Sequence, residues 1–159
     1  ILHRLVPELD QERMKPILEE VLSEENAYVA AHGGVLYPEV EQTLAALSAR
    51  CPLFLVSNCQ DGYIEAFFQA HGLGRYFTDY ENPGHTGLPK ADNIALVAER
   101  NGLRRPLYIG DTQGDYDAAS KAGVPFLHAA YGFGRIDRPV PSVATFGDLP
   151  DAIRRLTPP

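Results

Sequence analysis

The stretch from Leu107 to Gly123 constrains the fold of this chain more than any other part of the sequence. It opens with a short apolar run that predicts a buried strand, and Gly110 then lets the backbone turn into a helix. Asp111 and Asp115 lie four residues apart at this turn, a spacing that would place both carboxylates on one helix face. Ligands bind at this edge of open α/β sheets, and Mg²⁺ favours carboxylates together with water and phosphate. The sequence therefore predicts a magnesium site at Asp111 and Asp115.

A purely structural role for the same two residues is the simpler alternative. Asp111 would then cap the helix, and Asp115 would lie in its first turn, where acidic residues are favoured in any helix. Polar residues at the ends of neighbouring strands are needed to decide between these two interpretations.

Length and charge narrow the possible functions. The 159 residues suffice for one domain with a core, or for one domain with a small appendage. The formal net charge is −7 and the sequence holds no basic run, which argues against nucleic acid and membranes as partners. Cys51 and Cys59 flank a predicted strand that would hold them roughly 25 Å apart, beyond disulfide reach. We therefore expect reduced thiols and a cytoplasmic location.

Residues 1 to about 32 carry apolar side chains at helical spacing and no titratable cluster. Pro16 predicts a break or kink, Ser23 predicts a second helix start, and Gly33 with Gly34 predicts a stop. The pattern indicates a helical hairpin or part of a small bundle that packs on a neighbouring domain or closes over it. Because the chain starts at Ile1 within this pattern, we expect a fragment or a processed chain.

After Gly34 the pattern alternates between helices and short apolar strands. Pro38 is expected at the first position of a helix, Asp61 is expected to cap the next one, and residues 81–89 predict a mobile loop. We expect strands near residues 52–57, 76–80, 107–109, 125–127 and 143–146. Helices that alternate with such strands predict a doubly wound parallel α/β sheet.

Two further signals lie at the same predicted edge. Ser57 and Asn58 follow the strand that ends at Val56, and Lys90 opens a predicted helix after a turn. A hydroxyl can donate to a phosphoryl oxygen, an ammonium can offset its charge, and Mg²⁺ can bridge to it. Considered alone, Ser57 could be a simple turn residue, and Lys90 could be a solvated surface lysine. Together with the acid pair they predict a phosphate site.

These segments resemble motifs of a known family. Leu55–Asn58, then Lys90, then Ile109–Asp115 are similar to the second, third and fourth motifs of the haloacid dehalogenase-like hydrolases, most closely the phosphoglycolate phosphatase-like branch with a helical cap. The resemblance implies a cap remnant at 1–34 and a core at 35–159.

The same resemblance implies roles for the site residues. Ser57, Asn58 and Lys90 would bind the phosphoryl group of a small phosphorylated metabolite, and Asp111 would join Ser57 and Lys90 in the catalytic set. Asp111 and Asp115 would hold Mg²⁺, with Asp115 acting directly or through water.

The first motif of the family has no counterpart in this sequence. It consists of an aspartate nucleophile and a second aspartate two residues later, whereas the only Asp-x-Asp here joins Asp115 to Asp117. The covalent step needs such a nucleophile and an acid/base partner. We therefore expect the central strand to be missing and the chain to be inactive alone, with an upstream segment or a second chain completing the sheet. Val56 and Ile109 should then lie roughly 9.6 Å apart, two strand spacings.

The resemblance favours a Mg²⁺-dependent phosphohydrolase that cleaves small phosphate monoesters. A non-catalytic protein that binds phosphate or Mg²⁺ and has lost the nucleophile is the second hypothesis. A dinucleotide-binding domain is the third, and it is disfavoured because Gly132-Phe133-Gly134 leads towards prolines instead of a helix.

Overall fold

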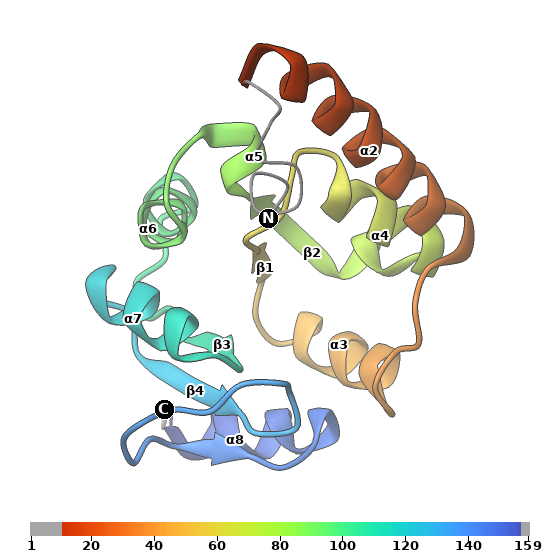
Figure 1. Cartoon of the computed structure of the whole chain (residues 1–159). Helices are drawn as coiled ribbons and strands as arrows, with labels where there is room; N and C mark the ends of the chain where they lie inside the picture. Colours follow the sequence, from red (N-terminus) through yellow and green to blue (C-terminus); the bar gives the residue numbers. More distant parts are fainter. Residues whose placement is uncertain (1–10, 157–159) are drawn as a thin grey trace.

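Helices and parallel strands alternate along the chain, which a computed structural model describes from residue 11 to residue 156 (Figure 1). The elements in chain order are α2 (Gln11–His32), α3 (Val40–Ser48), β1 (Leu53–Val56), α4 (Tyr63–His71), the 3₁₀ turn η1 (Leu73–Tyr76), β2 (Phe77–Glu81), α5 (Pro83–Thr86), α6 (Lys90–Arg100), β3 (Tyr108–Gly110), α7 (Gln113–Lys121), β4 (Phe126–Ala129), β5 (Ser142–Val143), the 3₁₀ turn η2 (Phe146–Asp148) and α8 (Leu149–Leu156). Within these residues no helix combines the length and the apolar character needed to cross a bilayer.

The strands form two separate sheets in which every pair is parallel. β1 pairs with β2, and β4 lies between β3 and β5. Parallel strands need crossover connections, and the helices between them supply these. The predicted α/β fold with parallel strands is thus confirmed. Among the described residues no backbone hydrogen bonds pair β1 with β3. The predicted distance between Val56 and Ile109, and the predicted segment between these two strands, stay predictions.

The core is built where helices bury their apolar faces against the strands. Helix α3 buries Val40, Leu44 and Leu47, which recur at helical spacing along one face. Leu47 packs with Leu127 of β4 and with the start of α8, while α6 and α7 share a second cluster. Full burial of such a side chain contributes about 1.5–3 kcal/mol, so these contacts hold the helices against the strands whose ends carry the predicted site.

Helix α2 corrects two predictions for the N-terminal region. It runs without interruption through Pro16 and Ser23, so neither a break nor a second helix start occurs there. Pro16 removes one backbone hydrogen bond, but α2 packs along α4 and Asn26 donates to the carbonyl of Asp61 at 2.8 Å (Figure 1). Contacts with residues far along the chain thus outweigh the local signals. The helix ends before Gly33, as predicted. Residues 1–10 lie outside the described part, and the division at residue 34 stays a prediction.

Two helix starts also differ from their predicted positions. Helix α3 begins at Val40 and not at Pro38, because Glu39 adopts a left-handed conformation with φ of 62° that no helix can include. Helix α4 is preceded by Gly62 with φ of 81°, so Asp61 does not cap it. The carbonyl of Asp61 instead accepts the hydrogen bond from α2.

Residues 81–89 hold regular structure within the predicted loop, because β2 ends at Glu81 and α5 spans Pro83–Thr86, whereas the mobility of this stretch stays a prediction. Glu81 and Asn82 are buried, and Asn82 caps the short helix α5 by accepting from the backbone N–H of His85 at 2.9 Å. Arg100 donates to Glu81 at 2.6 Å. These hydrogen bonds form a polar network in the turn-forming stretch, which leads into the start of α6.

Candidate functional site

The turn from β3 into α7 holds both predicted metal ligands. Thr112 caps α7, because its hydroxyl accepts from the backbone N–H of Asp115 at 3.1 Å and Asp115 closes a capping box. The alternative in which Asp111 caps this helix is therefore wrong, whereas its other part, Asp115 in the first turn, is confirmed. A Cβ on Gly110 would lie 2.5 Å from the Cβ of Asp115, so a glycine is needed here. The Thr-x-x-Asp spacing in the sequence was the signal that could have identified Thr112.

Asp115 is 6% exposed, and both of its carboxylate oxygens accept hydrogen bonds. Oδ2 accepts from the N–H of Asp111 at 3.2 Å, from the N–H of Thr112 at 3.0 Å and from the Thr112 hydroxyl at 2.9 Å. Oδ1 accepts from Lys90 Nζ at 2.5 Å. Burial alone would raise the pKa of Asp115, but the bonds from Lys90 and Thr112 outweigh it and lower the pKa below its ordinary value. Asp115 is therefore an ionised, fixed carboxylate.

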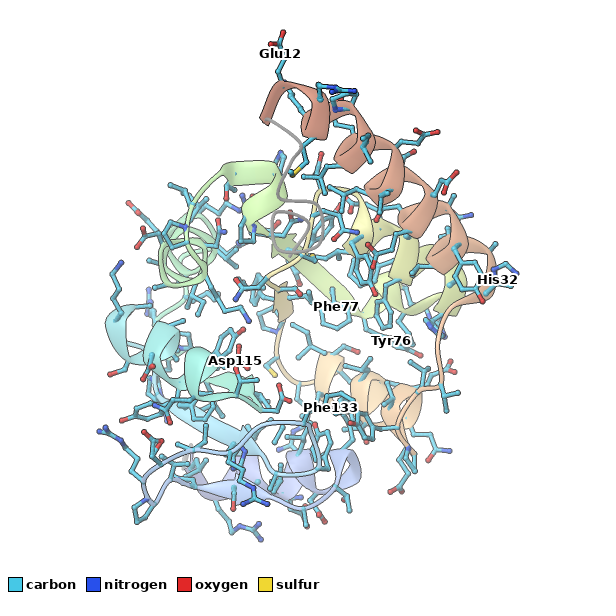
Figure 2. The ribbon with its side chains drawn as sticks, in the orientation of Figure 1. Glu12, His32, Tyr76, Phe77, Asp115 and Phe133 are labelled. Carbon is cyan, nitrogen blue, oxygen red and sulfur yellow. The ribbon has the colours of Figure 1, made fainter. Side chains whose placement is uncertain are left out.

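Lys90 is the first residue of α6, and its side chain is only 14% exposed. Helices α6 and α7 pack side by side, which brings Lys90 to Asp115 although 25 residues separate them. The structure thus unites these two predicted site residues and excludes the alternative of a solvated surface lysine. Figure 2 labels Asp115 on α7 and Phe133 in the loop after β4.

Asp111 is half-buried, and the loop after β4 wraps around it. The backbone N–H of Phe133 donates to Asp111 Oδ2 at 2.8 Å. A Cβ on Gly132 would lie 2.3 Å from the Cβ of Asp111, and one on Gly134 would lie 2.4 Å from the Asp111 carbonyl oxygen. This glycine loop is a part of the site that sequence reasoning missed, because the Gly-x-Gly pattern was weighed only as a dinucleotide motif.

Ser57 and Asn58 follow β1 directly, as predicted, and Ser57 N–H extends the β1–β2 ladder by donating to the carbonyl of Glu81 at 3.2 Å. Within residues 11–156 no hydrogen bond or ion pair joins Ser57 or Asn58 to the other three site residues. The end of β1 is linked to β3 by the Tyr108 hydroxyl, which donates to the Val56 carbonyl at 2.9 Å.

Tyr108 is a second residue that the sequence did not single out. Burial is the main cause that raises the pKa of its hydroxyl, and the nearby charges of Asp115 and Asp111 act in the same direction. The hydroxyl therefore stays protonated and remains a donor between the two sheets.

The chemistry of the donors can be compared with what Mg²⁺ requires. In the described part of the chain, no three His, Cys, Asp or Glu side chains gather into a metal-binding group. Mg²⁺ is commonly held by only one or two carboxylates, with water and phosphate completing its shell. Asp111 fits a direct ligand, because its Oδ1 accepts no hydrogen bond from the described residues. Asp115 fits a positioning group or a ligand through water, because both its oxygens are already engaged.

Comparison with known proteins identifies the family. Residues 1–129 match the model of the haloacid dehalogenase-like hydrolases, and the chain belongs to this family. Among curated proteins, it is similar to the phosphoglycolate phosphatases of Shigella boydii and Escherichia coli K12. Each is 32% identical over 135 residues, which is 79% of this chain and 52% of the relative. The chain therefore spans about half the length of these relatives.

Solved structures confirm the fold. A predicted phosphoglycolate phosphatase from Haemophilus somnus superposes with a TM-score of 0.74 at 23% identity and covers 91% of this chain and 68% of its own. A haloacid dehalogenase-like family protein from Streptococcus pneumoniae gives a TM-score of 0.75 at 18% identity, with 91% and 72% covered. At these identities the likeness shows the fold alone.

Proposed function

We propose that this chain forms the phosphate- and magnesium-binding part of a phosphatase that cleaves monoesters of small phosphorylated metabolites. The observation that supports this most is the buried ion pair between Lys90 and Asp115, 2.5 Å apart and next to Asp111. An ammonium held beside an acid pair attracts a phosphate that a metal ion also contacts. The phosphatase activity named for the curated relatives agrees with this chemistry.

In the proposed site the phosphoryl group lies between the ends of β1 and β3. The Ser57 hydroxyl and Asn58 donate to its oxygens, and Lys90 offsets its charge. Asp111 would hold Mg²⁺, which supplies Lewis-acid polarisation of the phosphoryl oxygens when it is bound. Lys90 and Thr112 keep Asp115 fixed behind Asp111.

Hydrolysis through an aspartyl-phosphate, which the family resemblance implies, needs one more group. A carboxylate oxygen bonds to phosphorus while the ester P–O bond breaks, and the leaving alcohol takes up a proton. Water then cleaves the acyl phosphate and releases inorganic phosphate and the carboxylate. Ser57, Lys90 and Asp111 position the phosphoryl group but do not accept it. We therefore propose that a separate strand supplies the nucleophile and that the chain alone is inactive.

Titration calorimetry with inorganic phosphate in excess Mg²⁺ tests the binding half of this proposal. Lys90→Met should weaken phosphate binding at least tenfold, because a charge-assisted hydrogen bond contributes about 1.5–3 kcal/mol and about 1.4 kcal/mol is tenfold. Lys121→Met is the matched control, since Lys121 is an exposed lysine of the same helix pair. Equal affinities for the wild type and Lys90→Met would contradict the proposal.

A further inference from the structure

Two different elements carry the residues that bind phosphate in the proposed site. Ser57 and Asn58 follow strand β1, whereas Lys90 is the first residue of helix α6. The short helix α5 lies between them in the chain and packs beside α6 (Figure 1). The contacts that hold α5 therefore bear on where the Ser57 hydroxyl and the Lys90 ammonium lie relative to each other.

Helix α5 is seated against the chain that leaves the end of β1. Gly84 of α5 donates its N–H to the Cys59 carbonyl at 3.3 Å. A Cβ on Gly84 would lie 2.1 Å from the backbone nitrogen of Asp61, so only a glycine permits this approach. Residues 59–61 follow directly after Ser57 and Asn58. One side of α5 is thus in close backbone contact with the Ser57 segment.

Asn93 of α6 holds the other side of α5, and its side chain is fully buried. The hydroxyl of Thr86, the last residue of α5, donates to Asn93 Oδ1 at 2.8 Å. Asn93 Nδ2 donates to the Leu88 carbonyl at 3.1 Å, and the Leu88 N–H donates to the Thr86 hydroxyl at 3.1 Å. These three hydrogen bonds join the end of α5, the turn after it and the first turn of α6.

The position of Asn93 in α6 explains what these bonds fix. Pro89 is the N-cap residue, so Leu88 lies just before the helix and Asn93 is its fourth residue. Contact between these two positions sets the angle at which a chain enters a helix, and it is commonly made by two apolar side chains. Here a hydrogen bond makes it, because Pro89 has no polar side chain to cap the helix. Alanine has a higher helix propensity than asparagine, so Asn93 contributes through its hydrogen bonds.

We propose that Asn93 is a positioning residue, which fixes Lys90 for the phosphoryl group by joining α5 to the first turn of α6. The proposal rests on the proposed function and deepens it, because it names the residue that sets the ammonium relative to Ser57. Lys90 is 14% exposed and bonds to Asp115 at 2.5 Å. A shift of the first turn of α6 would move the ammonium or break this bond, and phosphate binding would weaken in either case.

A double-mutant cycle, measured by titration calorimetry with inorganic phosphate in excess Mg²⁺, tests whether Asn93 acts through Lys90. Asn93→Ala should weaken phosphate binding about threefold to tenfold, the range that loss of one neutral hydrogen bond gives. In the Lys90→Met background the same substitution should have no further effect, because both changes act on one group. Asn101→Ala is the matched control and should leave the affinity unchanged. Asn101 lies at the other end of α6 and donates side-chain hydrogen bonds to Asp79 and to the Val97 carbonyl.

A pair of variants at Thr86 tests the same network and leaves the buried Asn93 in place. Thr86→Val keeps the shape of the side chain and removes the hydroxyl, so it should weaken phosphate binding as Asn93→Ala does. Thr86→Ser keeps the hydroxyl and should bind phosphate like the wild type. Circular dichroism checks that each variant is folded, and the Thr86 pair decides the test if Asn93→Ala does not fold.

Acetylation of lysines, quantified by peptide mass spectrometry, reads the position of Lys90 without phosphate. Modification of a buried lysine follows the fraction of time for which its site is open. Lys90 should therefore react faster in Asn93→Ala and in Thr86→Val than in the wild type, whereas Lys121, which is 66% exposed, should not change.

Two results would overturn the positioning role. One is an equal loss of phosphate affinity on Asn93→Ala with and without Lys90, which would show a general structural effect. The other is unchanged acetylation of Lys90 in the folded variants. If Lys90→Met itself leaves phosphate binding unchanged, the proposed function fails, and faster acetylation of Lys90 would still support its positioning by Asn93.

Discussion

Replacement of Asp115 by alanine should destabilise the fold far more than loss of a surface charge. The substitution leaves the Lys90 ammonium without its carboxylate in a site where the lysine is 14% exposed. It also removes the acceptor for the N–H groups of Asp111 and Thr112 and opens the capping box of α7. Each of these groups loses a partner that water cannot fully replace at a buried position.

The expected cost follows from the burial of this pair. Removal of one partner of a buried ion pair costs about 3–5 kcal/mol, whereas an exposed pair contributes about 0–1 kcal/mol. In a chain of this size 1 kcal/mol shifts the melting temperature by about 2–4 °C, so Asp115→Ala should melt roughly 6–20 °C below the wild type. Urea unfolding followed by circular dichroism measures the free energy directly, and this suits a chain without tryptophan.

The same two helices provide a matched control. Lys121 of α7 and Asp92 of α6 form an ion pair at 3.3 Å whose side chains are 66% and 45% exposed. Asp92→Ala should therefore cost no more than about 1 kcal/mol. If Asp115→Ala lowers the unfolding free energy as little as Asp92→Ala does, then Lys90 and Asp115 do not form a buried ion pair. The proposed phosphate site would then lose the observation that supports it most.

Three further predictions concern the metal carboxylate and its surroundings. Asp111→Asn should weaken Mg²⁺ binding in calorimetric titration, and equal affinity in wild type and variant would reject Asp111 as the ligand. Gly132→Ala should weaken Mg²⁺ binding about 10–100-fold because its Cβ displaces Asp111, whereas Gly114→Ala, with its nearest atom 3.7 Å away, should not. The lowered pKa of Asp115 stabilises the fold above its ordinary value of 3.8, and this contribution is lost as pH falls through the lower folded value. Unfolding free energies should therefore fall more steeply below about pH 4 for the wild type than for Asp115→Asn, and identical pH dependences would contradict this.

Local sequence signals, such as apolar runs and glycines, predicted the fold correctly where neighbouring signals indicated the same element. The apolar run before Gly110 and the left-handed Gly123 after α7 bound the strand–turn–helix unit that the sequence indicated. Signals failed where distant residues decide the outcome. Pro16 does not break α2 because the helix packs on α4, and the stretch after β2 contains the short helix α5 beside the bond from Arg100 to the buried Glu81.

Part of the candidate site could be predicted from the sequence, and part could not. Lys90 and Asp115 both lie at the starts of helices that follow parallel strands, and these starts lie at the ligand-binding edge of such folds, which is why the two residues could be expected close together. The N–H of Phe133 that holds Asp111 lies 22 residues away and is a backbone donor, which any residue type provides. The Tyr108 bridge was hidden because the two sheets meet only in the folded chain.

Hydrolysis of p-nitrophenyl phosphate in Mg²⁺ is the most direct test of the account, in which this chain positions a phosphoryl group for a nucleophile that a separate strand supplies. A preparation of confirmed mass should show no turnover alone. It should gain turnover when a synthetic peptide is added that carries an apolar strand followed by Asp-x-Asp, and it should not with a matched peptide that carries Asn-x-Asn. Ser57→Ala and Lys90→Met should reduce the gain. Robust turnover by the chain alone, abolished by Ser57→Ala, would contradict the account, because the nucleophile would then lie within these 159 residues.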